Sequence, residues 1–251
     1  MRQKPCIVFI TTIVLLATGL CPAADTLPFK PGEKLHYSVY LEEFSLGEVV
    51  FYVKPMEKIM TIPAYHFVMT SKTSPLLDSL FMLADRVDSY TDSALKHALL
   101  YKERHGSAGE LDSTVTFDWK KREAHYSLGK KKYRPTPLLP GAFDPLSVLY
   151  ALRLLDLKGK REVAKPVSDG LHCAVARAKV LGEQKVRAPS GTYDTYLLQP
   201  QLAEFSAVFK NISAAMVKIW ISADARRLPV RITCEFPVGS LMAELTAVES
   251  R

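Results

Sequence analysis

The sequence predicts a mainly β fold: one large curved antiparallel sheet or a partly open β-barrel, with one apolar helix packed against its concave face. Most of the 251 residues alternate apolar and polar side chains with a period of two, which is typical of half-buried strands. Short polar turns separate these strands, as in antiparallel hairpins. A long sheet must curl or close to bury its apolar face, and one apolar segment with helical spacing can pack inside the curve.

The first residues are typical of a secretory signal peptide. Arg2 and Lys4 precede an uncharged, mostly apolar run at 6–20, and small residues follow it. The run is shorter than the roughly 20 residues that a spanning helix needs, and no later stretch is long and apolar enough to span. We therefore expect a signal peptide at 1–23 and no transmembrane helix in the mature chain; an uncleaved anchor is the alternative.

Cys21, at the end of this run, raises the alternative of a lipid anchor. A bacterial lipoprotein signal has Leu three residues before the cysteine and a small residue just before it, whereas here Thr18 and the bulky Leu20 hold these positions. Cleavage after Ala23 suits an ordinary signal better. We expect Cys21 to be removed and the protein to be exported as a soluble periplasmic protein. Residues 24–251 form a single β-rich domain, because no repeat, linker or change of composition divides them.

The strand pattern starts at residues 33–44, where apolar and polar residues alternate. A turn at 45–47 and a returning strand at 48–55 complete a hairpin. Further strands of the N-terminal half are expected at 64–72, 85–92, 98–105, 112–119 and 123–128. Those of the C-terminal half are expected at 161–169, 171–182, 184–190, 192–200, 214–222, 228–236 and 240–248, with a turn at 223–227.

The apolar segment at 140–160 predicts a helix over 144–156. Asp144 is a good N-cap, and Pro145 suits the first helical position because its missing N–H needs no partner there. Leucines recur every three residues along the segment, and Gly159 marks its end.

A second apolar segment, at 74–84, could form a short helix with its large side chains on one side. If the curved sheet holds a cavity, the two helices would line it or cover it. The candidate cavity residues are Leu76, Leu80, Phe81, Leu146, Leu149 and Leu152.

Cys173 and Cys234 remain after cleavage. An even pair in an oxidising compartment suggests a disulfide, and two buried free thiols are the equal alternative. The bridge forms only if the two strands are neighbours with both side chains on the same face.

No catalytic or metal-binding constellation is recognisable. The six histidines are scattered and form no close ligand pair, so we interpret each as a surface or satisfied strand histidine. His172 beside Cys173 is no dyad, because neighbours on a strand point to opposite faces. Nucleophile elbow, phosphate loop and dinucleotide fingerprint are all absent from the sequence. We expect a protein that is not an enzyme and uses no metal or cofactor; a hydrolase with a site assembled from distant residues is the less favoured alternative.

Basic residues gather in or beside the turns. Removing Arg2 and Lys4 lowers the side-chain charge from +7 to +5, so the mature chain stays basic. Nucleic acid is not expected as a partner of an exported protein, whereas anionic lipid headgroups or acidic polymers are. The clusters would give peripheral contact with a membrane or an envelope protein; solvated hairpin tips are the alternative. The candidates are Lys130, Lys131, Lys132, Arg134, Arg226 and Arg227.

Four motifs in order resemble a known family. They are PFKPGEKLHYSVYLEEFSLGEV (28–49), FDPLSVLYALR (143–153), APSGTYDTYLLQP (188–200) and KIWISADARRLPVRI (218–232). Together they are similar to the domain of unknown function 3108 family of exported bacterial proteins, over roughly residues 28–248. The resemblance implies a secreted, β-rich envelope protein and brings no established activity or catalytic residues.

Several residues of these motifs also have structural interpretations. Gly47 and Gly191 suit turns that need a positive φ. Asp224 begins a hairpin turn, and Pro229 must lie where no ladder N–H is required. Arg153 could reach a carboxylate or the last carbonyls of the helix.

These observations favour an exported, non-catalytic binder or carrier of a lipid or another hydrophobic small molecule. The alternative is a structural or interaction protein of the cell envelope that acts through a sheet edge or through its basic hairpin tips.

Overall fold

The computed structural model describes residues 27–59, 61–73, 85–105, 112–201, 216–236 and 239–250. The signal peptide expected at 1–23, with Cys21, and the apolar segment expected at 74–84, with Leu76, Leu80 and Phe81, lie outside these residues. Within the described ranges, no helix has the length and apolar character needed to cross a bilayer.

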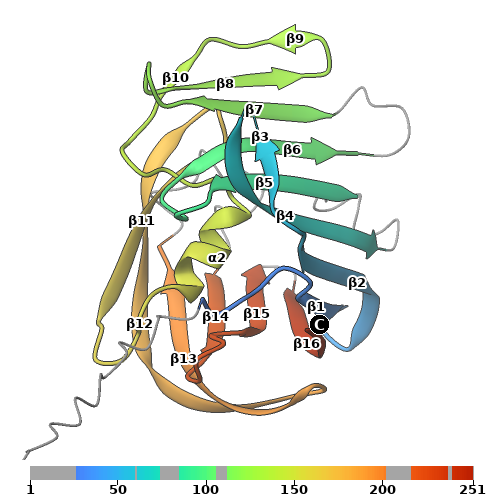
Figure 1. The fold of residues 1–251 in the computed structure, drawn as a ribbon. Helices are drawn as coiled ribbons and strands as arrows, with labels where there is room; N and C mark the ends of the chain where they lie inside the picture. The colour runs from blue at the N-terminus through green and yellow to red at the C-terminus, as the bar shows by residue number, and fades with distance from the viewer. Residues whose placement is uncertain are drawn as a thin grey trace, which may run out of the picture.

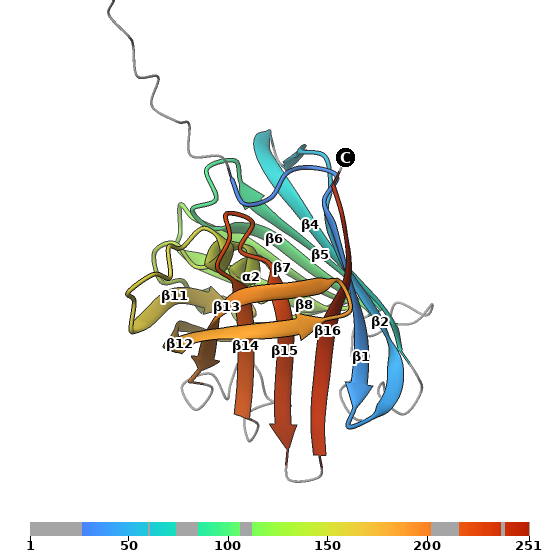
Figure 2. The ribbon, with the colours of Figure 1, turned by 90° about the horizontal axis from the view of Figure 1, so that it is seen from below.

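The strands form one antiparallel sheet that curves around a short helix, α2, as Figures 1 and 2 show from two sides. The strand order is β10-β8-β7-β6-β5-β4-β2-β1-β16-β15-β14-β13-β12-β11, with β3 beside β4 and β9 beside β8. Strands β10 and β11, at the two ends of this order, do not pair with each other, so the sheet is not closed into a barrel. The predicted fold class is confirmed in its open form.

The N-terminal half of the chain supplies the strands from β1 to β10, and most of these were predicted to within a few residues. In β1 the side chains of Leu35, Tyr37 and Val39 are buried, while their neighbours face outward. The strands are β1 (Lys34–Leu41), β2 (Phe44–Val53), β3 (Glu57–Ile59), β4 (Ile62–Thr73), β5 (Arg86–Asp92), β6 (Ala98–Arg104), β7 (Ser113–Asp118), β8 (Glu123–Leu128), β9 (Lys131–Lys132) and β10 (Thr136–Pro137).

The C-terminal half supplies the remaining strands, and the last of them, β16, pairs with β1. The sheet therefore joins the two ends of the described chain. The strands are β11 (Glu162–Ser168), β12 (Cys173–Ala188), β13 (Gly191–Pro200), β14 (Met216–Ser222), β15 (Pro229–Phe236) and β16 (Gly239–Glu249). The expected turn at 223–227 joins β14 to β15, and the Asp224 carboxylate accepts hydrogen bonds from the Ser222 hydroxyl and the Arg226 N–H within it.

The first hairpin turns earlier than expected. Its turn lies at Glu42 and Glu43, with Glu42 at φ 51°, and the expectation of a turn at 45–47 is wrong. Gly47 instead lies within β2 at φ 144°, opposite Val39 and beside a shift of register. A β-bulge inserts an extra residue without ending the strand. The positive φ of Gly47 therefore allows a bulge within β2, and not the turn that the sequence suggested.

A second bulge merges two predicted strands. The segments 171–182 and 184–190 belong to one strand, β12, which pairs with β13 on both sides of a register shift next to Gly182. Gly182 has φ 141°, and nothing lies within 4 Å of the position that a Cβ would take. The glycine therefore bends the strand without breaking it.

Helix α2 (Ser147–Arg153) is shorter than the helix expected over 144–156. Asp144 nevertheless caps its start, because Oδ1 accepts hydrogen bonds from the N–H groups of Leu146 (2.9 Å) and Ser147 (2.8 Å). The helix ends at Arg153, and the chain continues so that Leu157 is buried in a separate cluster against the C-terminal strands. Tertiary packing of the later leucines therefore ends the helix early.

The segment before α2 holds the helix inside the curve. Phe143 exchanges two backbone hydrogen bonds with β11, from its N–H to the Pro166 carbonyl (2.9 Å) and from the Ser168 N–H to its carbonyl (2.8 Å). The neighbouring Asp144 carboxylate accepts a hydrogen bond from the Ser89 hydroxyl of β5 at 2.6 Å. This short piece of chain thus ties β11, at one end of the open sheet, and β5, in its other half, to the start of the helix.

Aromatic rings and one buried ion pair fasten α2 to the concave face. The Tyr150 ring stacks on Phe67 with centroids 3.9 Å apart and meets Phe29 edge-on at 5.2 Å. Arg153, whose side chain is 1% exposed, donates to both carboxylate oxygens of Glu33 at 2.6 and 3.0 Å. The expectation that Arg153 reaches a carboxylate is confirmed.

Candidate ligand-binding groove

Helix α2 has a buried side and a half-buried side. Val148, Tyr150 and Ala151 are buried in the core. Leu149 and Leu152 are only half-buried, and their spacing of three residues places them on the same face of the helix. Two large apolar side chains that the core does not fully cover make this face of the helix a candidate binding surface.

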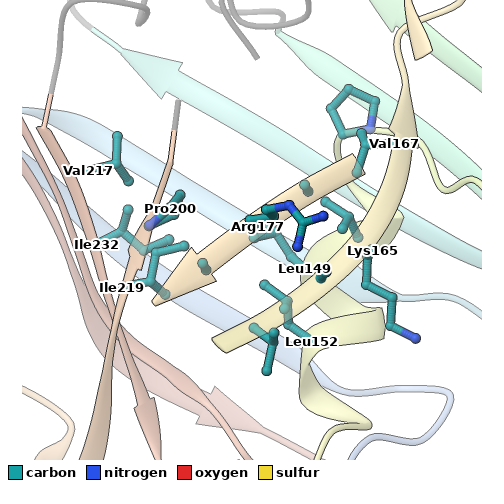
Figure 3. Close-up of a pocket in the computed structure, with 15 residues that line it drawn as sticks. Leu149, Leu152, Lys165, Val167, Arg177, Pro200, Val217, Ile219 and Ile232 are labelled. Carbon is teal, nitrogen blue, oxygen red and sulfur yellow. The ribbon is translucent and has the colours of Figure 1, made fainter. Parts of the chain in front are cut away.

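An apolar groove of ≈ 280 Å³ lies along this face, between α2 and the C-terminal strands. Figure 3 shows Leu149 and Leu152 of the helix on one side of the groove and Val217, Ile219 and Ile232 on the other. Every residue that lines the groove is apolar except Lys165 and Arg177. The lining residues are Pro145, Val148, Leu149, Leu152, Val163, Ala164, Lys165, Val167, Ala176, Arg177, Ala178, Pro200, Val217, Ile219 and Ile232.

The two charged residues of the lining are both cations. The Lys165 ammonium of β11 lies 5.8 Å from the centre of the Phe143 ring. Arg177 of β12 is paired with Glu162 at 2.9 Å. Because the alanines on either side of Arg177 line the groove, strand alternation directs the Arg177 side chain to the other face of the sheet. Lys165 alternates with the two valines of β11, which also line the groove, so it is the cation on the groove side of the sheet.

The sequence identified part of this groove. Leu149 and Leu152, which we expected in a cavity, do line it, whereas Leu146 is buried in the core at 4% exposure and is not among the lining residues. The strand residues of the groove were missed. They come from five strands between Val163 and Ile232, and each shows only the ordinary alternation of a half-buried strand, so no local signal distinguishes them.

The basic hairpin tips stay apart from the groove. Lys131 and Lys132 are exposed on β9, at the far end of the sheet order from β11. Arg226 is held by Asp224 at 2.6 Å, and its backbone carbonyl accepts hydrogen bonds from Arg153. The structure does not bring the candidates Lys130, Lys131, Lys132 and Arg134 together with Arg226 and Arg227.

The disulfide alternative is wrong, because Cys173 and Cys234 are both free. Cys173 begins β12 and Cys234 lies on β15, and these strands are not neighbours in the sheet. The Cys173 sulfur instead accepts a hydrogen bond from the Leu139 N–H. Burial raises the pKa of the Cys234 thiol to about 11, so it is a neutral, inert core group at neutral pH.

The buried carboxylate at the start of α2 is engaged in the fold. The Asp144 carboxylate accepts hydrogen bonds from two serine hydroxyls and two backbone N–H groups. Burial raises its pKa, and the hydrogen bonds from Ser89 and Ser147 oppose the rise. Among the described residues, no group of three His, Cys, Asp or Glu side chains is placed to hold a metal ion.

A second buried polar cluster lies on the outer face of β4 and β5. His66 is 4% exposed and lies between two carboxylates, with Nδ1 at Glu57 Oε1 and Nε2 at Asp88 Oδ1 (2.7 Å). Asp88 also accepts two hydrogen bonds from Arg86, at 2.6 and 2.7 Å. Both ring nitrogens are therefore occupied, as expected for a satisfied strand histidine.

Because of this cluster, the free energy of unfolding should decrease at acidic pH. Burial alone would raise the pKa of Asp88, but the hydrogen bonds and positive charges of Arg86 and His66 outweigh it and lower the pKa well below its ordinary 3.8. A carboxylate with a lowered folded-state pKa stabilises the fold above its unfolded-state pKa, and this stabilisation is lost as the pH falls through the folded-state value.

We therefore expect Asp88→Asn to be least stable relative to the parent near neutral pH, with the difference shrinking as the pH falls below about 4. Urea unfolding of both proteins over a pH series measures this difference. The control is Asp194→Asn, since Asp194 and its partner Lys185 are both largely exposed and such pairs contribute little. A constant gap between parent and Asp88→Asn across the series would contradict the assignment.

These features define a class of protein: an open, strongly curved antiparallel sheet with a helix in its concave face and an apolar groove beside the helix. The chain belongs to the family described as protein of unknown function DUF3108, whose family model matches residues 36–246. The resemblance seen in the four sequence motifs is thus confirmed. No curated protein matches the chain.

Three solved structures are similar over most of their length. A β-barrel-like protein of the domain of unknown function DUF1849 from Brucella abortus is 10% identical, with a TM-score of 0.49 over 86% of this chain and 96% of that one. A candidate exported protein with a YmcC-like fold from Bacteroides fragilis is 8% identical, with a TM-score of 0.31 over 89% and 98%. A candidate lipoprotein from Parabacteroides distasonis is 7% identical, with a TM-score of 0.37 over 88% and 96%.

Proposed function

We propose that the protein is an exported, non-catalytic binder or carrier of a single-chain amphiphile with an anionic headgroup, held in the groove beside α2. The observation that carries this proposal is the groove itself: its lining is apolar throughout except for two cationic residues. An acyl chain would cover Leu149 and Leu152, and Lys165 would meet the headgroup.

The size of the groove favours one chain over two. Its ≈ 280 Å³ lies just below the roughly 300–1,000 Å³ that is typical of small-molecule sites. Affinity would come from buried apolar surface, at about 25 cal/mol per Å². A single acyl chain supplies that surface without the second chain of a membrane phospholipid.

The charge of the lining selects the headgroup. A carboxylate or phosphate beside Lys165 would gain a charge-assisted hydrogen bond in a largely apolar site. A neutral headgroup would gain less, and a cationic one would be repelled. Export, which we expect from the signal peptide at 1–23, would place the protein where envelope lipids supply such molecules.

Native mass spectrometry of the gently purified, exported protein tests for a bound amphiphile. We expect extra mass that leaves on denaturation and extracts as a single-chain lipid. The mass of the chain also locates the cleavage site relative to Cys21. A ligand-free chain that also takes up no fatty acid would overturn the proposal and favour the interaction protein.

Substitution of the groove leucines should weaken fatty-acid binding. We expect Leu149→Gln with Leu152→Gln to weaken fatty-acid binding by about tenfold or more, since each leucine contributes roughly 1.5–3 kcal/mol of apolar burial. Titration of a fluorescent fatty acid, with thermal unfolding as the check on folding, measures the loss. Leu181→Gln is the matched control, because Leu181 is 52% exposed on β12 and does not line the groove.

Comparison of headgroups tests the role of Lys165. We expect Lys165→Gln to weaken binding of a fatty acid several-fold and to leave binding of the fatty alcohol of the same length unchanged. Equal effects on the two ligands would show that Lys165 acts only through packing, and the anionic headgroup would be dropped from the proposal.

A further inference from the structure

A second hollow, of ≈ 410 Å³, lies on the convex face of the sheet, across β1, β2, β4 and β5. It is separate from the groove, because none of its lining residues is shared with it. Its lining residues are Lys34, His36, Glu48, Val50, Tyr52, Lys54, Val68, Thr70, Lys72 and Arg86.

The register of the strands explains why these side chains converge. His36, Val50, Thr70 and Arg86 are successive cross-strand partners in one row, and partners in a row point to the same face. The short side chains of Val50 and Thr70 form the middle of the row, and the longer His36 and Arg86 form its two ends. The row spans three strand spacings of about 4.8 Å, or roughly 14 Å.

Cations border the hollow at its other ends as well. Lys54 lies beyond Tyr52 on β2, with its ammonium 5.0 Å from the Tyr52 ring centre. Lys72 lies two residues beyond Thr70 on β4, at the opposite end of the hollow. The lining therefore holds three lysines, one arginine and one histidine against a single carboxylate, Glu48.

Some of this charge is neutralised and some is not. Lys34 and His36 both contact Glu249 at 3.0 Å, and Arg86 is paired with Asp88. Within the described part of the chain, Lys54 and Lys72 have no ion-pair partner. Glu48 is the cross-strand partner of Lys72, but no ion pair joins them.

We propose that this hollow binds an anion that carries phosphate groups. The lysine ammonium groups and the Thr70 hydroxyl are donors suited to phosphate oxygens. The floor is roughly 14 Å wide between His36 and Arg86, and Lys54 and Lys72 lie at its two ends along the strands. Cations on all sides of such a floor favour a molecule with two phosphates over a single inorganic phosphate. The hollow is of small-molecule size, and the same chemistry could come from a soluble sugar bisphosphate or from a phospholipid headgroup.

The test uses fructose 1,6-bisphosphate and inorganic phosphate in solution, and vesicles of phosphatidylglycerol or phosphatidylcholine. Calorimetric titration measures the soluble anions, and co-sedimentation measures the vesicles. We expect the bisphosphate to bind more tightly than phosphate, with an affinity that falls as salt is added. Binding to phosphatidylglycerol vesicles alone would assign the phosphate to a lipid headgroup.

Two double variants with the same change of net charge locate the site. Lys54→Gln with Lys72→Gln removes the two cations that lack ion-pair partners, and we expect about tenfold or greater loss of affinity. Lys131→Gln with Lys132→Gln removes two exposed charges on β9, at the far edge of the sheet, where screening limits the effect to less than about twofold.

Neither pair of substitutions touches the core, so both variants should fold, and thermal unfolding checks this. Equal losses in the two variants would show attraction to the overall positive charge only. That result, or no binding by the parent to any of the probes, would overturn the proposal. The fatty-acid titration is run on the same variants as a control. Since the hollow and the groove share no lining residue, fatty-acid binding should be unchanged, so failure of this proposal can be distinguished from failure of the proposed function.

Discussion

Arg153→Met should destabilise the protein by about 3–5 kcal/mol, which is the usual result of breaking a buried ion pair by removing one partner. The Arg153 side chain is 1% exposed and the Glu33 side chain 6% exposed, and two hydrogen bonds join them. Arg153 also donates to the carbonyls of Pro28 and Arg226. Without the guanidinium, the buried Glu33 carboxylate, the buried Pro28 carbonyl and the partly buried Arg226 carbonyl each lose a partner, and for the buried groups water cannot easily replace it.

Urea unfolding of parent and variant measures the loss. Arg226→Met is the control, because only the backbone carbonyl of Arg226 accepts from Arg153, while its side chain forms an exposed pair with Asp224. We expect that variant to lose less than about 1 kcal/mol. A stable Arg153→Met protein would contradict the role assigned to the ion pair.

The double variant Glu33→Leu with Arg153→Met measures how much of each single loss comes from the interaction between the two residues. Replacing both partners by apolar side chains leaves no buried charge unpaired, so the double variant should be more stable than the sum of the two single losses predicts. Additive losses would show that the two residues act independently, in spite of the hydrogen bonds between them.

The ion pair also illustrates what the sequence could predict. Arg153 lies within a recognisable helical pattern, so its need for a partner was foreseeable. The identity of the partner was not, because Glu33 lies 120 residues away, just before a strand like any other. Period and capping are local signals, whereas contacts across a curved sheet depend on how far each strand is bent.

The same limit applies to the groove. The leucine spacing predicted Leu149 and Leu152, but it also predicted helix beyond Arg153, where Leu157 leaves to join the C-terminal cluster. The opposite wall was hidden in ordinary strand alternation. Two glycines suggested breaks in the sheet that are not there. Gly47 was expected in a turn and Gly182 at the end of a strand, but both lie at bulges, because bulges and turns draw on the same freedom of φ.

Gly170 is a glycine whose replacement should have a large effect. It has φ +87° in the turn between β11 and β12, and a Cβ there would lie 2.7 and 2.8 Å from the two methyl groups of Val115 on β7. Val115 is fully buried, so these methyl groups have little room to move. The turn thus packs directly against a strand from the other end of the sheet, and it helps to hold the open sheet in its curve.

We expect Gly170→Ala to destabilise the protein by about 1–2 kcal/mol for the unfavourable backbone and by about 1–3 kcal/mol more for the overpacked contact. Gly159→Ala separates these two effects. Gly159 has a similar φ of +66°, but nothing lies within 4 Å of the added Cβ. Its loss should therefore contain the backbone cost alone, and equal losses at the two positions would contradict the packing argument.

Relief of the contact gives the second check. Val115→Ala removes both methyl groups that would meet the new Cβ, at the cost of a small cavity. In its presence Gly170→Ala should cost much less than in the parent, because the backbone strain remains but the two closest contacts are gone. The cost should stay somewhat above that of Gly159→Ala, since the added Cβ still lies 3.1 Å from Tyr126 Cβ. The size of that rescue measures how tightly the β11–β12 turn is pressed against β7, and hence how firmly the opening of the sheet is held beside α2.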